Sequence, residues 1–370
     1  MKVLIAGDFC PMDRVAKQIE KENYESVFGE VVEYTQQADY SIVNLEAPVV
    51  EIYTKPIAKC GPNLKCTSKA VKALKYAGFD MVTLANNHFY DYGDDGVKQT
   101  LDACRKEDID VVGGGMNITD AAKIFYKEIK GNILAIINCC EHEFSIATEA
   151  SGGSNSLNPM LQYYAIQEAK RNADRVIVIV HGGHEHYRLP SPRMKETYRF
   201  FVDVGADAVI NHHQHCYSGY EVYKDKPIFY GIGNFCFDEE KRNDIWNNGY
   251  LVLLNIDDVI KFELIPYVQG NVEPGVIILK DRKDFDYSID NLNKVINDEI
   301  LLREEHKKFL DKFIKYYNLV LEPYQGRYLK ALYLRNMLPS FICKNRYYQL
   351  LNYICCESHL ERLLHALRNK

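Results

Sequence analysis

The chain has 370 residues, of which 47% are hydrophobic and 26% are charged, and its formal net charge is −6. This composition can form a substantial buried core and excludes a disordered, collagen-like or disulfide-scaffold protein. No apolar run approaches the roughly 18–20 residues that a membrane-spanning helix needs. The first residues turn acidic at Asp8, too early for a secretory signal, and we therefore expect a cytoplasmic protein.

The apolar runs that come first along the chain are short and bounded by Gly, Asp or Asn. They occur at residues 3–6, 40–43, 81–84, 111–112, 133–137, 176–180 and 208–210. Amphipathic segments at 68–77 and 96–106 lie between the earlier runs, a spacing typical of βαβ units whose strands are buried on both faces. Later strands are predicted at 220–223, 228–230, 251–256 and 261–266, joined by tight turns that indicate an antiparallel portion.

The last part of the chain differs from the rest in period and in charge. Residues 290–319 and 347–367 show helical spacing, so we divide the chain into a main domain, residues 1–275, and a helical appendage, residues 276–370. Residues 301–370 have a formal charge of +7, whereas residues 1–300 have −13. The acidic main domain argues against nucleic-acid binding, which needs positive charge at the site.

The appendage is rich in tyrosine and has two interpretations. Its tyrosines interleave with Arg327, Lys330, Arg335, Lys344 and Arg346, a pattern that can contact an anionic polymer or a membrane surface. Alternatively, the helices form a lid whose tyrosines pack on the main domain while its cations complement the acidic charge. We favour the lid, because basic amphipathic faces are commonly solvated surfaces.

The eleven cysteines include no C-x-x-C pair and no zinc-ribbon spacing. We therefore predict reduced thiols, most of them buried as small hydrophobic side chains.

Polar side chains that can bind a metal follow several predicted strands. Because the carboxyl ends of strands in an α/β sheet meet at one crevice, we expect a metal site there. Read alone, Asp8 is also a candidate helix N-cap, and His184 and His186 are candidate rim residues. His213 and His215 would alternate along an extended segment and face one ion. The residues that follow the strands are Asp8, Asn44, Glu46, Asn86, Asn87, His88, His181, His212, His213 and His215.

Taken in order, these residues resemble the calcineurin-like metallophosphoesterase superfamily, and within it the capsule-synthesis CapA (poly-γ-glutamate biosynthesis) family. The resemblance covers roughly residues 1–240. The motifs that carry it are Gly7-Asp8, Asn44-Leu45-Glu46-Ala47-Pro48, Leu84-Ala85-Asn86-Asn87-His88 with Asp91 and Gly93, His181-Gly182-Gly183-His184-Glu185, His212-His213-Gln214-His215, and Pro227-Ile228-Phe229-Tyr230-Gly231-Ile232-Gly233-Asn234-Phe235.

The resemblance implies an α/β fold: a four-layer αββα metallophosphoesterase-like sandwich, here with a C-terminal helical appendage. It implies a bridging role for Glu46 and a catalytic His88 that assists the leaving group. Asp91 is three residues after His88, and we expect its carboxylate to orient the imidazole. The metal ligands that it implies are Asp8, Glu46, Asn87, His181, His213 and His215.

The chain departs from the superfamily pattern at three positions. Cys10 stands where the D-x-H motif has its histidine, so one ligand is missing unless the Cys10 thiolate serves. Glu46 replaces an aspartate, and His212 stands where glycine is usual.

The implied ligand set suits one or two divalent ions of Mn, Fe, Zn or Mg. Such a centre supports a metal-activated hydroxide attacking a phosphoester or an amide, while His88 protonates the leaving group. We therefore predict a CapA-like metal-dependent hydrolase of capsule or poly-γ-glutamate metabolism, acting on an anionic polymer or a phosphoester. The alternatives are a non-catalytic capsule-assembly component, favoured by the lost D-x-H histidine, and a soluble phosphodiesterase or phosphatase.

Overall fold

The computed structural model describes residues 1–238, 244–270, 272–324, 326–342 and 344–368. The chain divides into two units, residues 1–303 and residues 304–370.

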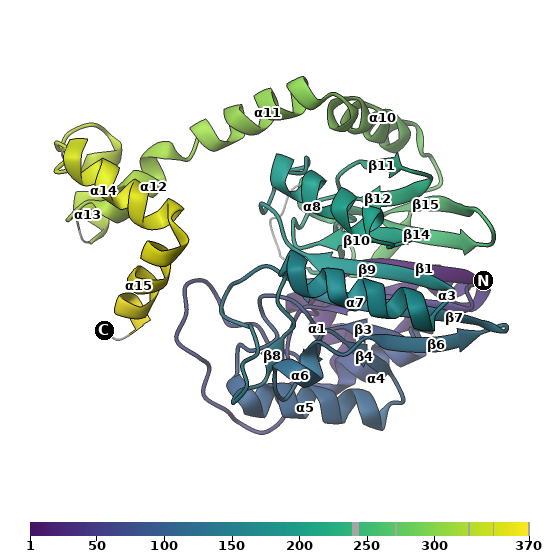
Figure 1. Cartoon of the computed structure of the whole chain (residues 1–370). Coiled ribbons are helices and arrows are strands. Elements are labelled where there is room, and N and C mark those ends of the chain that lie inside the picture. The colour runs from purple at the N-terminus through teal and green to yellow at the C-terminus, as the bar shows by residue number, and fades with distance from the viewer. Residues whose placement is uncertain (239–243, 271, 325, 343, 369–370) are drawn as a thin grey trace. The chain divides into compact units, whose positions relative to one another are not determined.

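The larger sheet of the first unit has eight strands (Figure 1). Their order is β16-β15-β14-β1-β2-β3-β4, and β13 pairs with the end of β1. Strands β1 to β4 are parallel, whereas β14, β15 and β16 are antiparallel. The strands are β1 (Lys2–Phe9), β2 (Tyr40–Leu45), β3 (Met81–Thr83), β4 (Asp110–Val112), β13 (Asn234–Cys236), β14 (Asn248–Ile256), β15 (Ile260–Gln269) and β16 (Val276–Ile278).

The second sheet has six strands in the order β11-β12-β10-β9-β7-β6. Its four central strands are parallel, and the two edge strands are antiparallel. The strands are β6 (Phe125–Ile129), β7 (Asn132–Cys140), β9 (Arg175–His181), β10 (Ala208–His212), β11 (Tyr220–Tyr223) and β12 (Lys226–Phe229), and a separate pair joins β5 (Gly114–Gly115) to β8 (Gly153–Ser154). The turn between β11 and β12 has positive φ at Lys224 and Asp225, as a two-residue hairpin turn requires.

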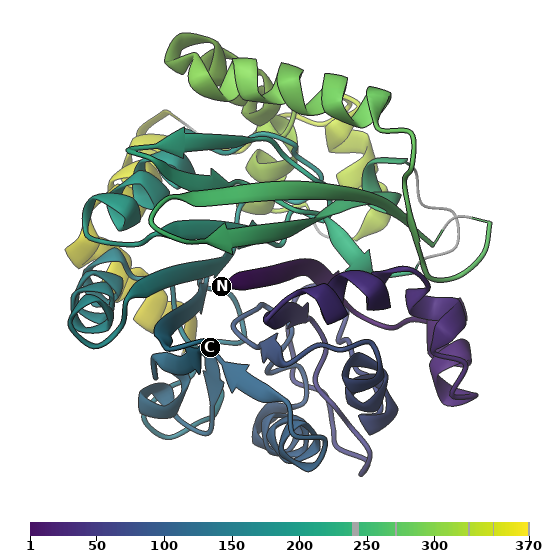
Figure 2. The same cartoon turned by 90° about the vertical axis from the view of Figure 1, so that its right-hand side faces the viewer.

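Helices cover the outer face of each sheet. They lie on opposite sides of the strands (Figure 2). Helices α1 (Asp13–Glu20), α2 (Glu25–Phe28), α3 (Val31–Gln37), α4 (Ser68–Tyr76) and α5 (Gly93–Lys106) pack on the larger sheet. Helices α7 (Pro159–Asn172) and α8 (Pro192–Asp203) pack on the smaller sheet. The other helices of the first unit are α6 (Ile118–Ala121), α9 (Asp244–Asn247) and α10 (Lys283–Asn297), and the division between the units falls within α11 (Glu299–Asp311).

Strand β1 shows why the apolar runs of the sequence are continuous rather than alternating. Val3 and Ile5 belong to the core between the two sheets, whereas Leu4 and Ala6 belong to the core under helices α1 to α5. Because successive side chains of a strand point to opposite faces, a strand buried on both faces must be apolar throughout. The first unit is therefore an αββα sandwich of four layers, as the resemblance implied.

The predicted elements of the first 270 residues are confirmed by strands and helices at the same places. Residues 290–319, predicted from one helical pattern, lie in three helices. The division of the chain falls after residue 303, whereas the sequence placed it at 275/276. Strand β16 pairs with β15, and Phe285 and Ile289 of α10 belong to the core between the sheets, which is why both elements lie in the first unit.

The second unit is helical, as predicted for the end of the chain. Its helices after α11 are α12 (Ile314–Leu321), α13 (Arg327–Leu334), α14 (Lys344–Cys355) and α15 (Glu357–Arg368). Leu319, Tyr324 and Tyr333 form its small core, whereas Tyr316 and Tyr328 are exposed. In the described part of the chain, none of the helices combines the length and the apolar character needed to cross a bilayer.

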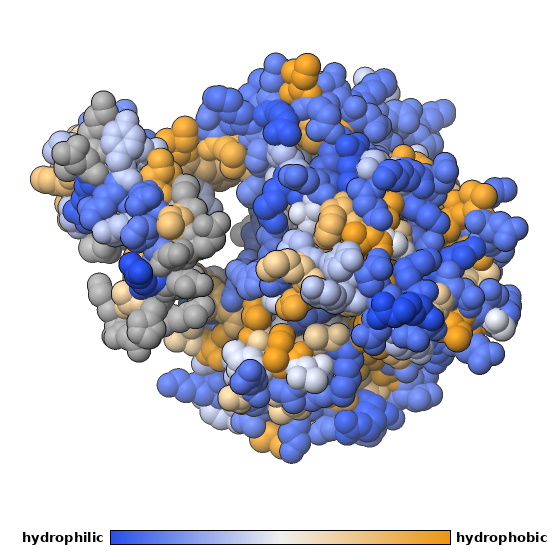
Figure 3. All heavy atoms as spheres, viewed as in Figure 1, coloured by the Kyte–Doolittle hydropathy of each residue, from blue (hydrophilic) through white to orange (hydrophobic). Residues whose placement is uncertain are grey.

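The surface of the first unit is largely hydrophilic on the face that carries α7, with apolar residues grouped between the polar ones (Figure 3). Met160 and Leu161 at the start of α7 are exposed apolar side chains. The cysteines whose side chains the structure describes are all free thiols, and most of them are buried.

Gly7 offers a test of the junction between β1 and β13. A Cβ atom at this position would lie 1.9 Å from the carbonyl oxygen of Gly233. Since that neighbour is backbone, we expect Gly7→Ala to force the two strands apart and to lower the free energy of unfolding by about 1–3 kcal/mol or more. Urea denaturation measures the change, with the exposed Lys2→Ala on the same strand as a control, expected to stay within about 0.5 kcal/mol. A Gly7→Ala protein as stable as this control would contradict the close approach.

Candidate metal centre

The carboxyl ends of parallel strands from both sheets meet at one place in the first unit. Asp8 lies near the end of β1, and Glu46 directly follows β2. His181 is the last residue of β9, and His212 is the last residue of β10. All four side chains are almost completely buried, so this is a polar site enclosed within the fold.

The carboxylate of Glu46 lies at the centre of the site without a hydrogen-bond partner. The residue is fully buried, and neither Oε1 nor Oε2 accepts a hydrogen bond in the described part of the chain. Burial, together with the charge of Asp8, raises the pKa of Glu46 well above its usual value. A buried carboxylate of this kind is costly unless it is paired or coordinates a metal.

Four side chains bring one donor atom each close together, and we call this set the first donor group: Glu46, Asn87, His181 and His213. The Nε2 atom of His181 lies 3.1 Å from Nδ1 of His213, 3.1 Å from Oδ1 of Asn87 and 3.6 Å from Oε1 of Glu46. In a tetrahedral shell with metal–ligand bonds of about 2.0–2.1 Å, neighbouring ligand atoms are about 3.3 Å apart. The spacing of the donors therefore fits a divalent cation.

Three residues make a second donor group: Asp8, Glu46 and His215. Each offers one ligand atom, and these atoms lie within 4.8 Å of one another. The Nε2 atom of His215 is 3.8 Å from Oε1 of Glu46, and its Nδ1 atom is 3.8 Å from Oδ2 of Asp8. Glu46 is thus shared by both groups, which suits a bridging carboxylate.

Hydrogen bonds from its neighbours hold Asp8 in place. Its Oδ1 accepts from Nδ2 of Asn44 at 2.7 Å and lies 3.1 Å from Nδ1 of His212, and its Oδ2 accepts from the backbone N–H of His213 at 3.2 Å. Burial alone would raise the pKa of Asp8, but the hydrogen bond with His212 and the nearby imidazoles lower it below its usual value. Asp8 is therefore an ionised and rigidly held donor.

His181 and His215 favour the neutral form. Burial, the largest effect, lowers the pKa of His181 well below its usual value and that of His215 to about 4. Nδ1 of His215 lies 2.9 Å from the amide oxygen of Asn234, which can only accept, so Nδ1 carries the proton and Nε2 faces Glu46 unprotonated. Neutral imidazole is the form that binds metals.

His88 and Asp91 form a pair next to Asn87. Nδ1 of His88 lies 2.7 Å from Oδ2 of Asp91, so Asp91 is placed to orient the imidazole. Asp91 also forms an ion pair with Lys59 and accepts a 2.6 Å hydrogen bond from the backbone N–H of Leu64. The side chain of Lys59 is only 3% exposed, and its Nζ atom is 3.2 Å from Nδ1 of His88.

The turn after β10 has a different geometry from the extended segment that we expected. His213 and His215 have φ values of 85° and 54°, which places both in the left-handed region that non-glycine residues rarely adopt. The prediction that they alternate along an extended strand is therefore wrong. Backbone strain of this kind persists where the surrounding structure enforces it, commonly at functional sites.

The structure places several residues differently from the alternative roles that the sequence left open for them. Asp8 caps no helix, because α1 begins after Met12. Cys10 belongs to the apolar core under helices α1 to α5, and burial raises the pKa of its thiol, which disfavours the thiolate. His184 and His186, like Cys10, are absent from both donor groups found among the described residues.

Sequence reasoning missed Lys59 and gave Asn234 no individual role. Lys59 lies in an irregular segment between β2 and α4, where no spacing or period marks it. Asn234 had a detectable signal, since it is a polar residue directly after Gly233 and before Phe235 in an otherwise apolar segment.

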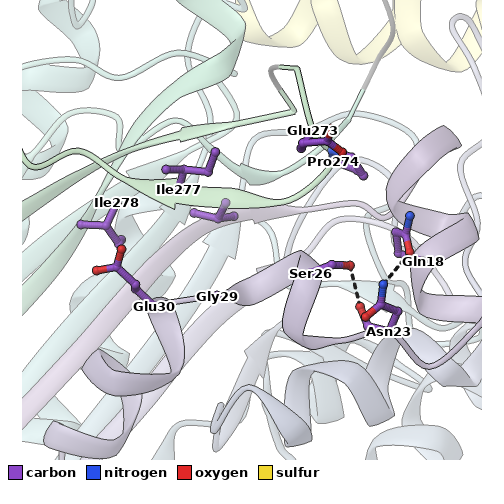
Figure 4. Close-up of a pocket in the computed structure, with 10 residues that line it drawn as sticks. Gln18, Asn23, Ser26, Gly29, Glu30, Glu273, Pro274, Ile277 and Ile278 are labelled. Carbon is purple, nitrogen blue, oxygen red and sulfur yellow. Dashed lines mark hydrogen bonds between the residues drawn. The ribbon is translucent and has the colours of Figure 1, made fainter.

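A pocket of about 480 Å³ lies outside the donor groups, between helices α1 and α2 and strand β16 (Figure 4). Asn23 donates a hydrogen bond to Gln18 there, and Ser26 donates one to the carbonyl of Asn23. None of its lining residues belongs to either donor group.

Residues 2–239 match the sequence profile of the family described as bacterial capsule synthesis protein PGA_cap. The chain belongs to this family. All residues of both donor groups, together with His88 and Asp91, lie within the matched part.

Two curated relatives have names that agree with this membership. The chain is 36% identical over 247 residues to the capsule biosynthesis protein CapA of Bacillus anthracis, covering 65% of this chain and 60% of that protein. It is 34% identical over 236 residues to the PGA biosynthesis protein CapA of Bacillus subtilis strain 168, covering 63% and 62%. The match thus spans about three fifths of the length of these relatives.

Among solved structures, a hypothetical protein from Thermus thermophilus aligns with a TM-score of 0.46 and 15% identity, over 72% of this chain and 99% of that one.

The unpartnered carboxylate of Glu46 gives a test of metal binding in this family member. We expect metal-free Glu46→Gln protein to unfold at a temperature no lower than the wild type, because the substitution removes a buried ionisable group. An ion that binds the folded state at about 100 times its Kd stabilises it by about 2.7 kcal/mol, and we expect the variant to lose this gain. Thermal unfolding with and without Mn²⁺ or Zn²⁺ measures both effects. The exposed Glu128→Gln is the matched control and should keep the metal response; equal responses of the two variants would exclude Glu46 as a ligand.

Proposed function

We propose that the chain is a metal-dependent hydrolase of capsule or poly-γ-glutamate metabolism. The observation that carries the proposal is the buried carboxylate of Glu46, which accepts no hydrogen bond among the described residues and is shared by two sets of nitrogen and oxygen donors. Such a set suits Mn²⁺, Fe²⁺ or Zn²⁺ better than Mg²⁺, because imidazole is a poor ligand for Mg²⁺. In this proposal Asp8, Glu46, Asn87, His181, His213 and His215 hold one or two ions.

A divalent cation, when bound, supplies Lewis-acid activation of water and of the oxygen at the scissile bond. The residues of the chain supply the proton transfer and the positioning. Asp91 engages Nδ1 of His88, which leaves Nε2 as the ring nitrogen that exchanges a proton with the leaving group. Lys59 keeps Asp91 paired on its other oxygen, so that the His88 imidazole keeps one orientation.

The biological setting of the proposal comes from the family and from the names of the relatives. Their printed names concern capsule and PGA biosynthesis. We infer a substrate that is an anionic polymer with γ-glutamyl amide bonds or a phosphoester, since both have an oxygen that a metal centre can polarise. The cytoplasmic location stays a prediction.

An activity screen tests the hydrolase. Purified protein with Mn²⁺ is assayed against an aryl phosphate monoester, an aryl phosphodiester and γ-glutamyl peptides. We expect turnover of one class, its loss on chelation, and a decrease in kcat of about 10²–10⁴-fold in His88→Gln, because a general acid contributes about that much.

His142→Gln is the control for this screen, since His142 is exposed and outside both donor groups. It should keep the wild-type rate. Protein that retains metal but turns over none of the three classes would contradict the hydrolase and favour the non-catalytic assembly component. Turnover restricted to the phosphoesters would favour a phosphodiesterase or phosphatase.

A further inference from the structure

Helix α12 of the second unit carries an apolar face that is exposed instead of buried. Residues at i, i+3, i+4 and i+7 share one side of a helix, and here they are Phe313, Tyr316, Tyr317 and Val320. All four side chains are exposed, and that of Val320 is 75% exposed. The buried residue of the helix is Leu319, which belongs to the small core of the unit. The core thus uses one side of α12, and we call the exposed side the outer face of α12.

Helix α13 adds exposed side chains of two kinds, apolar and cationic. Tyr328 and Leu329 are exposed next to Arg327 and Lys330. The guanidinium of Arg327 lies 5.4 Å from the centre of the Tyr328 ring. A hollow of about 450 Å³ is lined by Lys312, Phe313, Lys315, Tyr316, Tyr317 and Leu334. Cations and apolar side chains therefore lie next to one another on this surface.

Negative charge is almost absent from this stretch of the sequence. Between Asp311 and Glu357 there are seven lysines and arginines and a single acidic residue, Glu322. Glu322 is only 3% exposed, and its carboxylate accepts hydrogen bonds from the backbone N–H of Phe341 at 2.8 Å and from the hydroxyl of Ser340. Its charge is therefore used inside the unit and does not offset the cations on the surface.

The combination of cations and apolar groups distinguishes between the partners that can cover this surface. A second copy of the unit would bring like charges together, which is unfavourable. A hydrophilic polyanion would pair with the cations and leave the apolar side chains in water. A bilayer with anionic lipid satisfies both, because its phosphates attract Lys and Arg while tyrosine and aliphatic side chains enter the boundary between headgroups and acyl chains.

We propose that the second unit is a peripheral membrane-docking module, which lays the outer face of α12 on a bilayer that contains anionic lipid. The module lies outside residues 2–239, the part of the chain that matches the family profile. The proposal is independent of the metal centre and of the hydrolase. Because a basic patch or one short apolar face alone gives only weak attachment, binding needs both.

Co-sedimentation of the full chain with vesicles tests the proposal. The vesicles contain phosphatidylglycerol and phosphatidylcholine in equal parts, or phosphatidylcholine alone. We expect binding to the mixed vesicles, binding at least about 10-fold weaker to phosphatidylcholine because each cation near an anionic surface adds attraction, and a decrease with added NaCl because salt screens the charges. Binding to neither kind of vesicle, or equal binding to both, would overturn the inference.

Matched substitutions assign the binding to the outer face of α12. We expect Tyr317→Ser/Val320→Ser to weaken binding to the mixed vesicles at least about 10-fold, because two exposed apolar side chains no longer enter the bilayer. Tyr287→Ser/Val259→Ser is the control, since it changes the same residue types at exposed positions of the first unit, and it should bind as the wild type does. Far-UV circular dichroism checks that each variant is folded. Equal binding of the two variants would contradict the assignment.

Other occupants of the face give different results, each without vesicle binding. If the face packs on the first unit as the lid of the sequence interpretation, Tyr317→Ser/Val320→Ser lowers the free energy of unfolding more than the control does. If a second copy covers the face, the same variant shifts a dimer to a monomer in analytical ultracentrifugation. If the occupant is a polymer, the wild type binds soluble poly-γ-glutamate and the variant does not. Any of these three results would overturn the inference.

Discussion

The site in the first unit depends on one constraint, the free-energy cost of burying a carboxylate that accepts no hydrogen bond. Glu46 is fully buried, and neither of its oxygens accepts a hydrogen bond in the described part of the chain. An ionised group in that state costs several kcal/mol unless a cation or a proton compensates it. The surrounding side chains offer nitrogen and oxygen donors at the spacing of a metal shell rather than N–H donors to the carboxylate.

The αββα sandwich makes this arrangement possible by bringing together strand ends from two sheets. Asp8 and Glu46 come from the larger sheet, whereas His181 and the His212–His215 turn come from the smaller one. The apolar core between the sheets holds both sets at a fixed separation, because close-packed interiors tolerate little displacement. Asn44 links the sheets further, since its amide nitrogen lies 2.7 Å from Asp8 and 3.4 Å from His181.

Much of this could be predicted from local patterns. Continuous apolar runs predicted strands that are buried on both faces, and the polar residues directly after them predicted a site at the strand ends. Predictions from residue spacing failed where the backbone departs from regular structure. The left-handed φ values of His213 and His215 could not be predicted, because histidine has no strong preference for that conformation. Lys59 was missed for two reasons. It lies in a segment without a helical or strand period, and its partner Asp91 is 32 residues further along the chain.

Residue types and their order therefore determined the layers of the fold, the family and the set of candidate ligands. The tertiary structure decided how the ligands are divided: Glu46 is shared by one group with three further donors and a second group with two, and Cys10 lies in an apolar core instead of in the site. It also decided that Asp8 is satisfied by hydrogen bonds while Glu46 is not. The physical reason is that periodicity reports which face of an element is buried, whereas coordination depends on distances between atoms of different elements, which only packing sets.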